Sequence, residues 1–271
     1  MLNRIAPLVL LLSAITRLPA QVSTSHVMSA PWGQLVTNSS TSFDVASVAM
    51  RRTALRFRYL LGDTAPLIGL VVDDSSAGAA EAQAVSPEAQ PVVLISGSVR
   101  PNGSGRAELD TMVRIMTAST WVDEYAQRWR ASLLEVPRAN GPETIEAPAL
   151  PDWIRLGAVS LLSEGESANL FMRDHMRSAI PLRGLFALRV GATDDLSVAG
   201  PEAASVLSYL RAMEGVTATR DFFGMLATGS DVTTALSALP RFATIESLEV
   251  AWRRWLSAAP TDAVLPTTGV R

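Results

Sequence analysis

The chain of 271 residues contains no cysteine and only two histidines, His26 and His175. The missing cysteines exclude disulfides, thiolate nucleophiles and cysteine-based metal sites. The two histidines do not form a pair at helical ligand spacing, so we expect both to be solvent-exposed residues without a metal or catalytic role. No Gly-x-Ser-x-Gly motif occurs either, and the scarcity of histidine leaves any serine without the base of a catalytic triad.

Charge of one sign is not in excess. The 23 Lys and Arg residues are balanced by 26 Asp and Glu residues, which gives a formal net charge of −3. Proteins that bind nucleic acid usually carry a basic surplus, so nucleic acid is not an expected partner. Hydrophobic residues make up 48% of the chain, which indicates a compact globular body rather than a disordered protein.

The N-terminus has the organisation of a secretory signal. Arg4 precedes an apolar run over residues 5–15 that is too short to span a bilayer, and Ala20 ends a segment suited to cleavage. No later segment reaches the ~20 unbroken apolar residues of a spanning helix. We therefore expect residues 1–20 to be a signal peptide and the protein, starting near Gln21, to be exported to the periplasm or the medium. An uncleaved N-terminal anchor is the alternative.

Hydrophobic periodicity predicts strands mixed with helices in the first part of the chain. Apolar runs predict strands over residues 32–37, 67–72 and 91–95, and a helix lies between the first two, capped by Ser42 and closed by Gly62. Residues 106–134 then predict one long helix that ends before Pro137. Its inward face is expected to carry the apolar stripe of Leu109, Val113, Met116, Trp129 and Leu133.

Beyond residue 150 the pattern predicts helices alone, over residues 152–163, 168–176, 200–213, 218–227, 231–239 and 247–258. This order predicts an α+β fold. A mixed sheet with helices occupies residues 21–105, the long helix and an all-helical part occupy residues 106–260, and residues 261–271 form a disordered tail.

Three segments of the second half carry motifs in a fixed order. They are residues 150–157 (LPDWIRLG), residues 205–210 (SVLSYL) followed by Gly215, and residues 247–256 (SLEVAWRRWL). In this order they resemble the peptidase MA-like family of gluzincin zinc peptidases. The resemblance implies a zincin-like fold, in which one long helix carries His-Glu-x-x-His and a second helix, in the motif Leu-Pro-x-Trp-Leu-x-Glu-Gly, supplies the third zinc ligand.

The resemblance places residues 123–127 (DEYAQ) at the position of His-Glu-x-x-His. It makes Asp123 and Gln127 the former zinc-ligand positions of the long helix and Glu124 the degenerate general-base position. An alternative register over residues 112–116 contains no acidic or imidazole residue. The third former ligand position is Leu156, which offers zinc only a hydrocarbon.

The family uses zinc, but its ligands are missing here, so no metal and no cofactor is expected. The resemblance also implies that Trp153, Gly157 and Tyr209 line the former substrate cleft.

The sequence therefore predicts an exported pseudoenzyme, a peptidase-like domain that binds an unknown protein or peptide partner or serves as a scaffold. The alternative is an active metal-dependent hydrolase with an atypical site centred on Glu124, in which Asp123 and Glu124 hold a hard cation. A simpler interpretation of Glu124 is a surface residue that pairs with Arg128 one helical turn further on.

Overall fold

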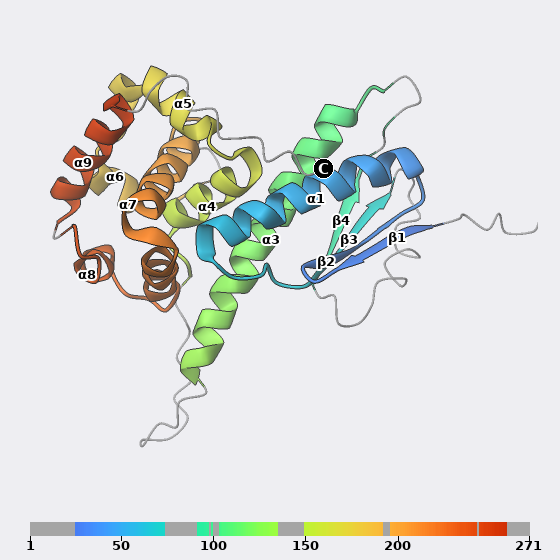
Figure 1. Cartoon of the computed structure of the whole chain (residues 1–271), viewed down its shortest axis with the longest axis horizontal. Helices are drawn as coiled ribbons and strands as arrows, with labels where there is room; N and C mark the ends of the chain where they lie inside the picture. The colour runs from blue at the N-terminus through green and yellow to red at the C-terminus, as the bar shows by residue number, and fades with distance from the viewer. Residues whose placement is uncertain are drawn as a thin grey trace, which may run out of the picture.

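The computed structural model describes residues 25–73, 91–97, 99, 103–134, 149–191, 196–242 and 244–258. The expected signal peptide and the expected C-terminal tail both lie outside these residues. The described residues form an α+β fold, in which a small mixed sheet lies at one end and a group of helices at the other (Figure 1). None of the described helices is long and apolar enough to cross a membrane.

The sheet has four strands in the order β1-β2-β3-β4. The predicted strands are confirmed as β2 (Gly33–Thr37), β3 (Ile68–Asp73) and β4 (Val92–Ser96), which run parallel to one another. The edge strand β1 (His26–Ala30), antiparallel to β2, was not predicted. His26 is therefore not a freely solvated residue, because it belongs to β1 and its ring lies 5.8 Å from that of Phe43.

Helix α1 (Ser40–Leu61) connects β2 to β3 and has both of its ends capped. Its N-cap is Ser39 rather than the predicted Ser42, and the Ser39 side chain accepts a hydrogen bond from the Ser42 backbone N–H. At the other end Gly62 adopts a left-handed conformation (φ 77°) and donates its N–H to the carbonyl of Arg58, as the sequence predicted for the helix stop.

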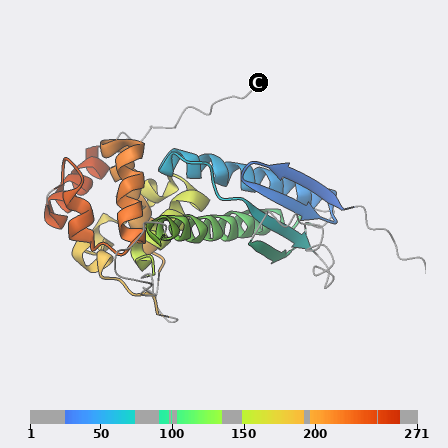
Figure 2. The same ribbon diagram turned by 90° about the horizontal axis from the view of Figure 1, so that it is seen from below.

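Helix α3 (Arg106–Leu134) has the predicted bounds and lies beside α1, so that both helices run from the sheet towards the C-terminal helices (Figure 2). Its predicted inward stripe is only partly correct. Leu109 and Val113 are buried and Trp129 is half-buried, but Met116 is 40% exposed, and the side chain of Leu133 lies outside the described part. In the second half of α3 the buried residues are instead Thr117, Ala118, Trp121, Val122, Tyr125 and Ala126.

The second half of the structure is helical, as predicted. Its elements are α4 (Asp152–Glu164), α5 (Ser167–Asp174), the 3-10 turn η1 (Met176–Ser178), α6 (Leu182–Phe186), α7 (Ala199–Ala227), α8 (Val232–Ser237) and α9 (Ile245–Ala258). Helix α7 contains a break at Gly215 (φ 83°, ψ 175°), which separates the two helices that the sequence predicted there.

Two arginines fix the end of α4 against α1 and α3. The Arg56 guanidinium donates to the carbonyls of Leu162 (3.1 Å) and Ser163 (2.6 Å), and Arg114 also donates to the Ser163 carbonyl. Positive charge at the carboxyl end of a helix is favourable, because the last carbonyls there have no helical partners. Burial, together with the nearby Arg114 charge, lowers the pKa of Arg56. This contact sets the position of α4 relative to α3, where the candidate site lies.

Candidate functional site

Helices α3 and α4 meet at an ion pair between Asp123 and Arg155. The guanidinium Nε donates to Asp123 Oδ1 and Nη2 donates to Asp123 Oδ2, both at 2.8 Å. The same Nη2 donates to the hydroxyl of Ser119, one turn earlier on α3, also at 2.8 Å. The bond to Asp123 raises the pKa of Arg155. Asp123, to which the resemblance assigns a zinc ligand, thus binds α4 through a guanidinium.

The resemblance assigns the other two zinc ligands to the positions of Gln127 and Leu156. Gln127 is exposed and Leu156 is half-buried. Glu124 is half-buried, and the expected ion pair with Arg128 is not formed, since neither side chain makes a hydrogen bond or ion pair with any residue that the structure describes.

These residues do not fit a zinc ion. A catalytic zinc site needs three protein ligands, of the kind supplied by imidazole or carboxylate groups, at one point. Here the Asp123 carboxylate is bound to Arg155, Gln127 offers a neutral amide and Leu156 offers no donor. Across the described ranges, no three His, Asp or Glu side chains lie together in a way that could hold a metal ion.

The three residues expected to line a cleft lie in the core instead. Trp153 is fully buried, with its ring 4.3 Å from that of Phe186. Gly157 lies where α4 crosses α7, so close that a Cβ atom there would be 2.7 Å from the carbonyl carbon of Ala203. Tyr209 is buried and its ring contacts that of Trp255 at 5.3 Å. These three residues therefore serve helix packing in this structure.

His175 is exposed at the end of α5, as expected for a residue without a metal role. Its ring stacks on that of Phe171 at 4.0 Å, and Nδ1 lies 2.8 Å from the Phe171 carbonyl oxygen.

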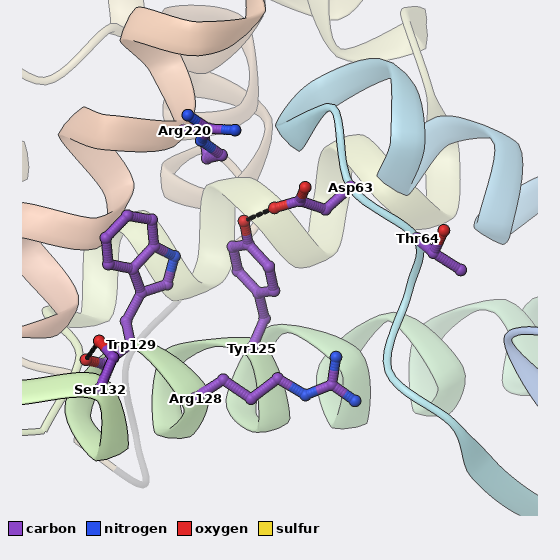
Figure 3. Close-up of a pocket in the computed structure, with 7 residues that line it drawn as sticks. All are labelled: Asp63, Thr64, Tyr125, Arg128, Trp129, Ser132 and Arg220. Atoms are coloured by element: carbon purple, nitrogen blue, oxygen red, sulfur yellow. Dashed lines mark hydrogen bonds between the residues drawn. The ribbon is translucent and has the colours of Figure 1, made fainter. Parts of the chain in front are cut away.

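A pocket of about 560 Å³ lies on another side of α3 (Figure 3). Its residues come from the segment after α1, from α3 and from α7, and are Asp63, Thr64, Tyr125, Arg128, Trp129, Ser132 and Arg220. Residues advance about 100° around a helix, so Tyr125 points to the side of α3 roughly opposite Asp123. The pocket is therefore separate from the Asp123–Arg155 contact.

Tyr125 lies at the centre of the pocket wall and is held in place by several partners. Its hydroxyl donates to the Asp63 carboxylate (Figure 3), and its ring contacts those of Phe57 (5.3 Å) and Phe223 (5.8 Å). Burial, with the bond to Asp63, raises the pKa of Tyr125. Tyr125 is therefore a neutral hydrogen-bond donor that fixes Asp63, not a nucleophile.

The pocket carries two guanidinium groups. Arg220 pairs with Asp221, at 3.2 Å from Nε to Oδ1, whereas Arg128 is exposed and has no side-chain partner within the described residues. The ring of Trp129 packs against α7 at Gly224, where a Cβ atom would lie 2.8 Å from the indole. Sequence reasoning did not find this pocket, since Asp63 and Arg220 are far from α3 in the chain.

No protein-family model, no curated protein and no solved structure matches this chain. The fold and the site are therefore interpreted from the residues of this chain alone.

Proposed function

We propose that this protein is an exported, non-catalytic domain of the peptidase MA-like type that acts by binding. The similarity of residues 150–157, 205–210 and 247–256 to the family's motifs supports the peptidase-like origin. One contact carries the proposal that the domain is not catalytic, namely the ion pair between Asp123 and Arg155.

The ion pair joins α3 and α4, the two helices to which the resemblance assigns the zinc ligands. A zinc ion neutralises negative ligands and ties the two helices together, and the Arg155 guanidinium does both for Asp123. Both Asp123 oxygens are engaged by the guanidinium. A metal would therefore have to break two charge-assisted bonds and tolerate a fixed positive charge beside it.

Glu124 is left without the partners that its catalytic role requires. A general base in a metallopeptidase acts on a water that the metal has activated. The positions aligned with the metal ligands supply one paired carboxylate, one exposed amide and one hydrocarbon. This is why the alternative, a hydrolase centred on Glu124, is not the proposed function.

The experiment is a joint measurement of zinc binding and peptide hydrolysis by the full-length exported protein. The protein is incubated with zinc sulfate, desalted and analysed for metal, and casein hydrolysis is followed for the parent, Glu124→Ala and Glu108→Ala. Glu108 is an exposed residue of the same helix and serves as the matched control. We expect far less than one zinc per chain and no turnover above that of buffer in all three proteins. Turnover that is abolished by a chelator and by Glu124→Ala, but kept in Glu108→Ala, would overturn the proposal.

A further inference from the structure

The pocket between α3, α7 and the segment after α1 has the size and the mixture of groups typical of small-ligand sites. Its volume of about 560 Å³ falls within the range of about 300–1,000 Å³ that such sites occupy. Three elements that are distant in the sequence supply its walls, and Figure 3 shows that its polar groups come from all of them. A site of this kind is formed by the tertiary structure and not by one helix surface.

The charges of the pocket favour an anion. Arg128 and Arg220 contribute two guanidinium groups, and Asp63, the acidic residue among the lining residues, already accepts a hydrogen bond from Tyr125. Arg220 shares its charge with Asp221, so Arg128 is the guanidinium whose donors remain unused by described residues. A planar guanidinium binds a carboxylate through two parallel hydrogen bonds.

The same charges favour a monoanion over a phosphate. A phosphate ester carries nearly two negative charges near neutral pH. Asp63 also lines the pocket and would repel the additional charge, and its carboxylate is held in place by the Tyr125 hydroxyl. One ligand carboxylate bound to Arg128 brings the summed charge of Arg128, Arg220, Asp63 and the ligand close to zero.

The apolar part of the pocket favours an aromatic group. Trp129 supplies the accessible ring of the pocket, and the buried ring of Tyr125 supports it from behind, with the two centroids 6.5 Å apart and the planes at 79°. Trp129 is only half-buried although its ring packs against α7 at Gly224. A partly exposed indole can pack against another aromatic ring, and Thr64 and Ser132 add hydroxyl groups to the lining of the pocket.

We propose that this pocket binds a ligand with one carboxylate and one aromatic group, with Arg128 binding the carboxylate and Trp129 contacting the ring. The chemistry is that of a free aromatic acid or of a peptide whose last residue is aromatic. The inference deepens the proposed function and rests on it, since it identifies a ligand class for a binding domain. It does not involve Asp123, Glu124 or Arg155.

The experiment is calorimetric titration of the full-length protein with four probes. The probes are N-acetylglycylphenylalanine, its C-terminal amide, 3-phenylpropionate and phenyl phosphate. We expect the peptide acid, 3-phenylpropionate or both to bind, and the amide to bind at least about 10-fold more weakly, since the charge-assisted bonds are lost. Binding of the peptide acid alone assigns the site to peptide C-termini, and binding of 3-phenylpropionate as well assigns it to aromatic carboxylates in general.

The variant that tests the assignment is Arg128→Gln, with Arg254→Gln as the control. Both arginines are exposed and have no side-chain partner among the described residues, so both variants should fold like the parent. Arg128→Gln should weaken the binding of the acids by about 10- to 100-fold, and Arg254→Gln should leave it unchanged. The proposal is overturned if neither acid binds, if the amide or phenyl phosphate binds as tightly as the acids, or if Arg128→Gln has no effect. None of these results would alter zinc content or turnover, which test the proposed function separately.

Discussion

Arg155 on α4 binds both carboxylate oxygens of Asp123 on α3, at 2.8 Å each. Asp123 stands where the family resemblance places a zinc ligand, and Arg155 immediately precedes Leu156, where the resemblance places another. A guanidinium therefore joins α3 and α4 beside these two positions. The Asp123–Arg155 ion pair must therefore be taken into account in any variant that tests the metal positions.

The first prediction concerns the strength of this ion pair. The two side chains are 42% and 41% exposed, so solvent screens the pair, and its coupling free energy should be about 0.5–1 kcal/mol despite the bidentate geometry. A double-mutant cycle with Arg155→Gln and Asp123→Asn, measured by urea unfolding, gives this value. Arg155→Lys should recover less than half of it, because an ammonium group cannot form two parallel bonds. Arg254→Gln is the control and should leave the free energy of unfolding nearly unchanged. A coupling free energy of zero between Asp123 and Arg155 would contradict the prediction.

The second prediction compares two helical glycines. Gly157→Ala places a Cβ atom 2.7 Å from backbone of α7, which neither helix can avoid by rotating a side chain, so the free energy of unfolding should fall by about 1–3 kcal/mol. Gly200→Ala meets no atom within 4 Å beyond its own helix and chain neighbours, and the helix preference of alanine is opposed by the clash of its Cβ with the ring of Pro201, so it should change the free energy of unfolding by less than about 1 kcal/mol. Urea unfolding of both variants tests the packing of α4 on α7. The prediction fails if Gly157→Ala is as stable as Gly200→Ala.

The third prediction concerns Glu202, a fully buried carboxyl group on α7. Its Oε2 accepts a hydrogen bond from the Ile180 N–H at 2.9 Å, whereas Oε1 is buried without a hydrogen-bond partner in the described structure. Burial raises the pKa of Glu202 from 4.5 to about 7, against the opposing effects of the Ile180 N–H and the Arg253 charge, and the nearby Glu249 adds to the increase.

The sign of the resulting pH dependence follows from proton binding. Between about pH 4.5 and pH 7 the folded state keeps the Glu202 proton and the unfolded state loses it, so the free energy of unfolding should fall as the pH rises through this window. The loss attributable to this group is on the order of 3 kcal/mol. Glu202→Gln should remove most of this dependence, while Glu108→Gln, an exposed control, should retain it. Urea unfolding at about pH 5 and about pH 8 measures the difference.

Much of the fold could be predicted because it depends on local patterns. The bounds of α3, the break near Gly215 and the stop at Gly62 all follow from helical periodicity and from glycine at helix ends. Strand β1 was missed because it is an edge strand, half-buried on one face and exposed at Val27, so its residues lack a strong apolar alternation. Met116 was placed inside because one apolar stripe was extended along the whole length of α3. The helix in fact contacts β3 and β4 as well as α1, α4 and α7, and its buried face changes along its length.

The site could be predicted less well because its contacts are distant in the sequence. Periodicity places Asp123 and Arg155 on two helices but says nothing of their distance, so the ion pair was not foreseen. For the same reason Trp129 was interpreted only as a packing residue, although with Asp63 and Arg220 it lines a pocket. Trp153 and Tyr209 were expected in a cleft on the strength of motif positions, and burial in the core explains the same positions.

The last prediction tests the former zinc positions and takes the ion pair into account. Asp123→His, Gln127→His and Leu156→Glu together would supply two imidazoles one turn apart and a carboxylate from α4, leaving a fourth position for water. Because Arg155 binds position 123, its positive charge should oppose the metal, so Arg155→Gln is added. We expect the fourfold variant to bind about one equivalent of zinc in a calorimetric titration, the triple variant to bind at least about 10-fold more weakly, and the parent to bind none.

Stability provides the control for this experiment. Leu156 is half-buried, so a glutamate there should destabilise the metal-free fourfold variant, because its carboxylate is partly desolvated without a partner. Zinc binding only to the folded state should restore about 2.7 kcal/mol when free zinc reaches about 100 times the dissociation constant. Thermal unfolding with and without zinc measures this gain, and the parent should show none. A fourfold variant that is folded, as judged by circular dichroism, but neither binds zinc nor gains stability from it would mean that Asp123, Gln127 and Leu156 never formed the family's metal site.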